Sequence, residues 1–178
     1  MHTYSLFCET AKCRLITRNV EKSFDCIAIY PKLIQHTWSK GKMIDIEHDL
    51  LPGYVFVYCD RELLNIELVR SVQGVIRCLG TADGKYELTD RDEQFALMLL
   101  RNRGVIGKTK VYEEGQLIRI CEGAFKGLET RILKVNRQKK RMQIEIPFAS
   151  TLVKTWVEFE IVSDLKEEES EKNLLPKS

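Results

Sequence analysis

The stretch that decides the fold is Leu51-Pro52-Gly53-Tyr54-Val55-Phe56-Val57-Tyr58-Cys59. Proline fixes its φ near the value that a turn needs, and glycine reaches φ values that other residues avoid, so Pro52-Gly53 predicts a turn. The six residues that follow are β-prone and apolar or aromatic, which is typical of a strand buried on both faces at the centre of a sheet. Val55 and Val57 are expected in the core. Tyr54 and Phe56 keep two interpretations, because a large ring beside a turn can also lie at the rim of the sheet and face a partner.

The rest of the first half predicts further strands and amphipathic helices around this strand. Strands are expected at 4–8, 26–30 and 75–80, and helices are expected to begin near residues 10, 62 and 89. Thr10 and Thr89 are the predicted N-caps, and Gly104 is predicted to end the third helix. The residues expected to face inward recur at helical spacing: Ala11, Leu15, Ile16 and Val20, then Leu64, Leu68 and Val69, then Phe95, Leu99 and Leu100.

The segment 32–49 predicts a hairpin. Ser39-Lys40-Gly41-Lys42 has the composition of a turn, and its flanks can pair as strands. The tip carries two lysines and follows Trp38. It is either a solvated loop or a tip that touches nucleic acid.

The second half changes character. Val105–Tyr112 carries Gly107, two lysines and no helical period, so it predicts a linker. Short alternating strands are expected at 117–120, 131–135, 142–146 and 155–159, a pattern typical of a small barrel or sandwich. Glycines near both ends of 122–129 allow a tight loop in which Phe125 plugs the barrel. The charged segment 166–178 is expected to be disordered.

A basic run lies within this second half. The net charge of the chain is only +2, so attraction to nucleic acid needs a local patch. Between residues 131 and 141 there is no acidic residue, and 137–141 is the predicted tip of a hairpin. Such a run attracts phosphates in a salt-dependent way, although a basic turn can also serve solubility alone. Its six basic residues are Arg131, Lys134, Arg137, Lys139, Lys140 and Arg141.

Several classes of protein are disfavoured. The first ten residues lack the pattern of a signal peptide and no apolar run is long enough to span a bilayer, so a cytoplasmic protein with reduced thiols is expected. The six cysteines contain no C-x-x-C pair, and the three histidines complete no zinc pattern. Phosphate-loop and hydrolase motifs are absent from the sequence. We therefore expect no enzyme, no metal and no cofactor.

Two blocks of sequence together resemble the NusG family of transcription elongation factors. They are Leu51–Val57 followed by Leu68–Val75, and a V-x-I-x-x-G-x-F-x-G-like tract around Phe125. The resemblance implies an α+β fold, in which an NGN domain with an antiparallel sheet flanked by helices is joined by a linker to an SH3-like β-barrel KOW domain. The implied divisions are 1–104 for the NGN domain, 105–111 for the linker, 112–165 for the KOW domain and 166–178 for a disordered tail.

The resemblance also implies partners. Family members bind the clamp helices of RNA polymerase through an apolar patch on the NGN domain, and burial of aromatic anchors is a physical means of doing so. Non-template DNA is an open alternative partner, although Ser71-Val72 replaces the Asn-Thr of pause-promoting members. A monomer without membrane contact is expected. The positions that match the polymerase-binding motif are Leu51, Tyr54 and Phe56, with Glu67 and Arg70 toward the opposite side of the cleft.

Departures from the general pattern favour a specialised paralogue. Thr130 replaces a usual glycine, and Pro147-Phe148-Ala149-Ser150 replaces the tract that general members offer to Rho or to the NusE ribosomal protein. The chain is most similar to the LoaP-type antiterminators, whose KOW domain engages an RNA hairpin in the nascent transcript. The residues expected to contact RNA are Lys126, Arg131, Lys134, Arg137, Lys139, Lys140 and Arg141.

Three rival functions stay open. They are a general NusG factor that couples transcription to Rho or the ribosome, a ribosome-associated RNA-binding protein with a KOW barrel, and an enzyme that uses a cysteine of low pKa. Phe125, Ile144 and Val157 alternate as strand residues do, so a stable barrel is expected. Whether that barrel covers the polymerase-binding patch is a further open alternative.

Overall fold

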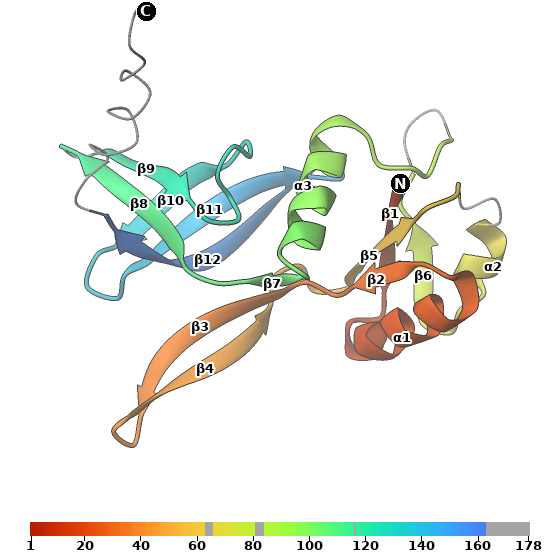
Figure 1. The fold of residues 1–178 in the computed structure, drawn as a ribbon, viewed down its shortest axis with the longest axis horizontal. Coiled ribbons are helices and arrows are strands. Elements are labelled where there is room, and N and C mark those ends of the chain that lie inside the picture. The colour runs from red at the N-terminus through yellow and green to blue at the C-terminus, as the bar shows by residue number, and fades with distance from the viewer. Residues whose placement is uncertain (63–65, 81–83, 116, 163–178) are drawn as a thin grey trace, which may run out of the picture.

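The computed structural model describes residues 1–62, 66–80, 84–115 and 117–162. Its first half is built on a four-stranded antiparallel sheet in the order β2-β5-β1-β6 (Figure 1). The central position of β5 confirms the buried strand predicted after Pro52-Gly53. The elements of this half are β1 His2–Cys8, the 3-10 helix η1 Thr10–Lys12, α1 Cys13–Phe24, β2 Ile27–Ile29, β5 Tyr54–Cys59, α2 Ile66–Arg70, β6 Val75–Cys78 and α3 Asp90–Arg101.

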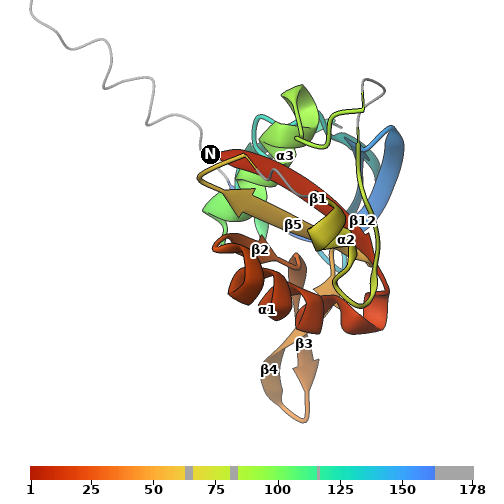
Figure 2. The ribbon, with the colours of Figure 1, turned by 90° about the vertical axis from the view of Figure 1, so that its right-hand side faces the viewer.

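Alternation along β5 divides the core into two layers. Val55 and Val57 pack on the side of α1 and α2, whereas Phe56 and Tyr58 pack on the side of α3. The Tyr58 hydroxyl donates a hydrogen bond of 2.7 Å to the carbonyl oxygen of Ala96, which ties α3 to the sheet. Figure 2 shows α1 on one side of the sheet and α3 on the other.

The predicted hairpin is confirmed and projects from the first half (Figure 1). It consists of β3 Lys32–Ser39 and β4 Lys42–Asp49, and β7 Val105–Ile106 pairs in parallel with the start of β3. Lys40 and Gly41 form a two-residue turn with φ values of 48° and 76°. Two positive φ values match the twist of paired strands, so this short turn fixes the register of the hairpin.

The second half is a five-stranded sheet in the order β10-β11-β12-β8-β9 that curls around a core containing Phe125, Met142 and Val157. Phe125 is 1% exposed, as predicted for a plug. The expected fold class, an α+β domain followed by a β-barrel, is confirmed. The strands are β8 Thr109–Glu114, β9 Leu117–Glu122, β10 Arg131–Asn136, β11 Arg141–Phe148 and β12 Thr151–Ile161.

The predicted linker at 105–111 holds β7 and the first residues of β8, so its backbone is paired with strands of both halves. The division of the chain at 104, 111 and 165 stays a prediction. The segment 166–178, expected to be disordered, lies outside the described residues.

Several predictions about the helices are wrong in detail. Thr10 lies in the 3-10 helix and does not cap α1, which begins three residues later. This later start turns Cys13, Ile16 and Val20 inward and leaves Leu15 exposed, while Ala11 lies exposed in the 3-10 helix.

The short second helix departs from its prediction too. Helix α2 has five residues and buries only Val69, so Leu68 is exposed. Leu64 lies outside the described residues. Thr89 occupies the N-cap of α3 without a side-chain capping bond, and Leu100 is only partly buried.

Candidate functional site

An aromatic face lies on the side of the sheet that carries α3. We define it by the rings of Tyr54 and Phe56 from β5 and Phe95 from α3. The centroids of Phe56 and Phe95 are 5.9 Å apart in an edge-on arrangement. Leu51 lies in the turn before β5 and belongs to the same core layer. Alternation along β5 places Tyr54 and Phe56 on one face, because residues 54 and 56 share a side of the strand.

One ring from the second half covers this face. Phe148, at the end of β11, lies with its ring centroid 5.7 Å from that of Tyr54, 5.2 Å from Phe56 and 5.4 Å from Phe95. Phe148 is 1% exposed and Phe56 is fully buried. Tyr54 and Phe56 therefore combine the two interpretations. Their rings are packed in a core, and they face a partner, which is a segment of the same chain.

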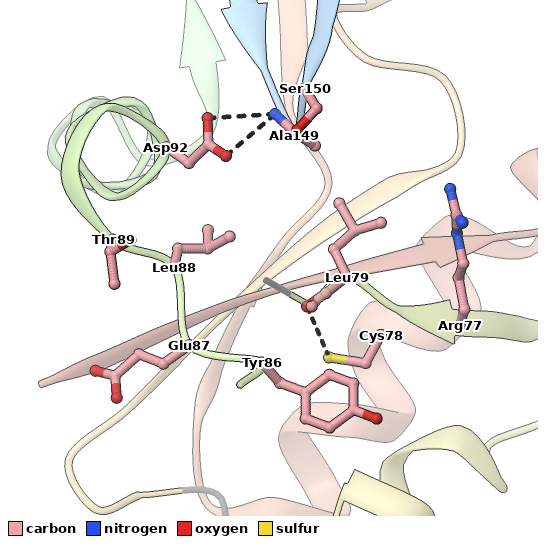
Figure 3. Close-up of a pocket in the computed structure, with 11 residues that line it drawn as sticks. Arg77, Cys78, Leu79, Tyr86, Glu87, Leu88, Thr89, Asp92, Ala149 and Ser150 are labelled. Atoms are coloured by element: carbon pink, nitrogen blue, oxygen red, sulfur yellow. Dashed lines mark hydrogen bonds between the residues drawn. The ribbon is translucent and has the colours of Figure 1, made fainter. Parts of the chain in front are cut away.

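Two sets of polar contacts also join the second half to the first half. The backbone N–H of Ala149 donates to both carboxylate oxygens of Asp92, at 3.2 and 3.1 Å (Figure 3). On the hairpin side, the backbone N–H of His36 donates to Glu158 at 2.9 Å, and His36 Nδ1 lies 2.8 Å from the other Glu158 oxygen. Glu158 is only 6% exposed. A buried carboxylate needs such partners, so this contact orders β3 against β12.

A cavity of about 380 Å³ lies between the halves beside Asp92 (Figure 3). The Cys78 thiol at its wall donates to the Leu79 carbonyl oxygen at 3.8 Å. Burial raises the pKa of Cys78 to about 12, so at neutral pH almost none of the nucleophilic thiolate is present. This thiol therefore does not support the rival interpretation of a cysteine enzyme.

The structure does not bring Glu67 and Arg70 to the aromatic face. They form an exposed ion pair of 2.9 Å on α2. Val69 of that helix packs into the layer on the other side of the sheet. The five predicted polymerase-contacting residues thus fall on two separate surfaces.

The predicted RNA-contacting residues gather in part. The turn between β10 and β11 carries Arg137, Lys139 and Lys140, and Arg141 begins β11. Arg131 lies at the far end of β10. A register shift between Ile132 and Lys134 leaves both Arg131 and Lys134 exposed.

Some of these cations have a carboxylate partner, at distances that range from a close contact to a long one. Arg137 lies 2.9 Å from Glu113, Arg141 lies 3.6 Å from Glu158, and Arg131 lies 3.9 Å from Glu145. Among the seven predicted RNA-contacting residues, four have no ion pair within the part of the chain that the structure describes and form the available charge: Lys126, Lys134, Lys139 and Lys140.

Sequence reasoning missed the residues that join the halves. Phe148, Asp92, His36 and Glu158 come from four different elements. The one local signal was Pro147-Phe148-Ala149-Ser150, in which a large apolar ring precedes a tight turn. Ala149 and Ser150 have φ values of 50° and 61°, so the turn between β11 and β12 is short.

Among the described residues, every helix is too short or too polar to span a bilayer. Likewise, the described ranges hold no group of three or more His, Cys, Asp or Glu that could hold a metal ion. All six cysteines are free thiols.

A family model described as transcription termination factor NusG matches residues 1–97. The chain belongs to the NusG family. Among curated members, the transcription termination/antitermination protein NusG of Pseudomonas aeruginosa is 29% identical over 108 residues, covering 60% of this chain and 61% of that protein. The corresponding protein of Rickettsia typhi is 22% identical over 108 residues, covering 60% and 56%. The aligned part thus spans less than two thirds of these NusG relatives.

A solved structure supports the fold beyond that aligned part. The structure titled "Domain interaction in Thermotoga maritima NusG" superposes with a TM-score of 0.57 at 17% identity. It covers 88% of this chain and 93% of the other. At this identity the likeness concerns the fold of a NusG protein and not its specific contacts.

Proposed function

We propose that this NusG-family chain is a transcription elongation and antitermination factor. Its aromatic face binds the clamp helices of RNA polymerase, and its second half binds an RNA hairpin in the nascent transcript. The observation that carries the proposal is the aromatic face itself. Three rings converge on one side of the sheet, and a single ring at the end of a hairpin covers them. A face of this kind is suited to another apolar partner, such as a helical hairpin.

Polymerase binding requires the second half to move away. Phe148 occupies the place that the helices of polymerase would take. The free chain is therefore closed, and docking selects an open form in which Phe148 has left the aromatic face. The closed form holds the barrel intact, with Met142, Ile144 and Val157 in its own core. Opening thus needs no refolding of the second half.

RNA binding depends on the lysines of the β10–β11 turn. Lys139 and Lys140 are exposed and lack ion pairs within the described residues, so their charge is available to phosphates. A-form RNA is recognised mainly through its shape and its backbone, which suits a cationic turn better than a base-reading helix. This chemistry agrees with a LoaP-type role, which we include in the proposal.

The polymerase step is tested with Tyr54→Ala. Removing an aromatic anchor from the centre of an interface costs about 2 kcal/mol or more, or roughly thirtyfold in Kd. Tyr112→Ala is the control, since Tyr112 is a half-buried tyrosine on β8 and makes no ring contact with the aromatic face. Kd is measured with purified core polymerase. Equal affinities of the two variants, or no binding by the unaltered protein, would contradict the proposal.

The RNA step is tested with the double variant Lys139→Ala/Lys140→Ala. Loss of two phosphate contacts lowers the slope of log Kd against log salt by about 1.4–1.8. The control is Arg18→Ala/Lys22→Ala, which removes the same charge from α1. The measurement is a salt series with a labelled stem-loop RNA. An unchanged slope in the first variant rules out this role for the turn.

A further inference from the structure

A groove of about 330 Å³ lies where the β3–β4 hairpin meets the β10–β11 turn. Figure 1 shows the hairpin and the barrel on the same side of the molecule. The groove is lined by Gln35 of the first half and by Asn136, Lys139, Arg141 and Trp156 of the second. Its volume lies near the lower end of the roughly 300–1,000 Å³ typical of small-ligand sites.

The groove combines an aromatic surface with positive charge. The Trp156 side chain is 38% exposed, so part of its ring is open to a ligand. Lys139 lacks an ion pair within the described residues, and Arg141 keeps only the long contact of 3.6 Å to Glu158. An indole beside two cations is the arrangement on which single-stranded nucleic acids stack a base and place a phosphate.

Two amides supply hydrogen-bonding groups at the walls. Gln35 Nε2 donates to the Trp156 carbonyl oxygen at 3.3 Å, which leaves the Gln35 Oε1 as an acceptor. Asn136 Oδ1 accepts from the Lys139 backbone N–H at 2.9 Å, which leaves the Asn136 Nδ2 as a donor. One donor and one acceptor together match the edge of an unpaired base.

We propose that this groove binds one unpaired nucleotide of RNA, with its base stacked on Trp156 and its phosphate beside Lys139 and Arg141. The inference rests on the proposed RNA binding and names the part of an RNA that the free, closed chain holds before it docks on polymerase. It also makes the site bipartite. Because Gln35 belongs to the first half, the groove is complete only in the closed arrangement.

This location couples the groove to the aromatic face. A ligand that binds only the closed form favours that form, and polymerase favours the open one. By linkage, filling of the groove weakens polymerase binding by the same factor by which polymerase weakens the groove. A bound unpaired nucleotide therefore opposes polymerase binding, and docking on polymerase in turn weakens the binding of the nucleotide.

The chain allows a direct test because it has only two tryptophans, Trp38 and Trp156. In Trp38→Phe the remaining indole reports on the groove, and in Trp156→Phe the remaining indole, 70% exposed on the hairpin, is the control. The probes are single-stranded hexauridylate, a blunt RNA duplex without unpaired nucleotides, and a hexaglutamate peptide. Fluorescence is titrated at low salt, and anisotropy of labelled RNA measures binding independently.

Hexauridylate is expected to quench Trp156, whereas the duplex and the peptide leave its fluorescence unchanged. Trp156→Ala weakens hexauridylate binding, measured by anisotropy, by about fivefold to hundredfold, the range for loss of one stacked base. Gln35→Ala and the opening variant Phe148→Ala weaken it in the same direction, although neither removes a cation or an aromatic ring from the groove.

Three results would overturn the inference. Binding of RNA by anisotropy without quenching of Trp156 rejects the groove and leaves the proposed RNA binding intact. Equal quenching by hexaglutamate shows a site for acidic peptides instead. Failure of every RNA to bind in either assay rejects the groove and the proposed RNA function together.

Discussion

Truncation of Phe148 separates the two halves of the molecule. All three rings that contact Phe148 belong to the first half, and the side chain is 1% exposed. Phe148→Ala therefore removes stabilisation mainly from the closed arrangement. The cores of the sheet and of the barrel keep their own residues. We expect the variant to remain folded and to open more often.

The magnitude follows from the burial of the ring. Loss of a buried phenylalanine side chain costs about 3–5 kcal/mol. The contacts of Asp92 with Ala149 and of His36 with Glu158 remain, so we take the lower value. About 3 kcal/mol corresponds to a shift of roughly a hundredfold in the closed-to-open ratio. Because apparent Kd equals intrinsic Kd divided by the open fraction, polymerase binding tightens by up to that factor and then levels off.

The assay is biolayer interferometry against an immobilised clamp-helix fragment of RNA polymerase. Leu152→Ala is the matched control, since Leu152 is the second residue of the neighbouring strand β12 and is 61% exposed. Its Kd should equal that of the unaltered chain. If Phe148→Ala retains its circular dichroism spectrum and yet binds within twofold of the unaltered chain, then the ring does not hold the molecule closed.

Two stability predictions concern the first half. Gly104 has a φ of +73°, and a Cβ there would collide with Ile29, so Gly104→Ala should lower the free energy of unfolding by about 2 kcal/mol or more. Gly107→Ala, with nothing within 4 Å of its Cβ, should change it by less than about 0.5 kcal/mol in urea titrations. Burial alone would raise the pKa of Asp49, but the hydrogen bond from Lys32, the neighbouring Tyr30 hydroxyl and the charges of Lys32 and Arg14 together outweigh it, and the pKa is lowered. The folded pKa lies below the unfolded one, so the pair stabilises above about pH 4 and is lost as pH falls through the folded value. Asp49→Asn should therefore cost at most about 1 kcal/mol at pH 7 and flatten the acid limb of unfolding measured from pH 7 to 3, whereas an acid limb identical to that of the unaltered chain would exclude this pair.

Local patterns predicted most of the strands and the three helices, whereas β8 begins in a segment predicted as a linker, and the family resemblance supplied the class of fold. Alternation after Pro52-Gly53 predicts β5 and both of its faces, and Lys40-Gly41 predicts the hairpin turn. These features depend on backbone preferences and on periods of two or 3.6 residues, which a short window of sequence contains. Local patterns did not predict where α1 begins, because a 3-10 helix before α1 rotates its buried face without changing its composition.

The sequence by itself determined a sheet with an aromatic strand at its centre, a hairpin, and a basic unit of short strands that is either a barrel or a sandwich. Only the tertiary structure decided that Phe148 covers Tyr54 and Phe56, that α2 holds Arg70 on the opposite side of the sheet, and that a carboxylate lies near each of the three predicted RNA-contacting arginines. The physical reason is the separation along the chain. Phe148 follows Tyr54 and Phe56 by about ninety positions and meets them through the packing of whole layers, and no local period records which faces will meet.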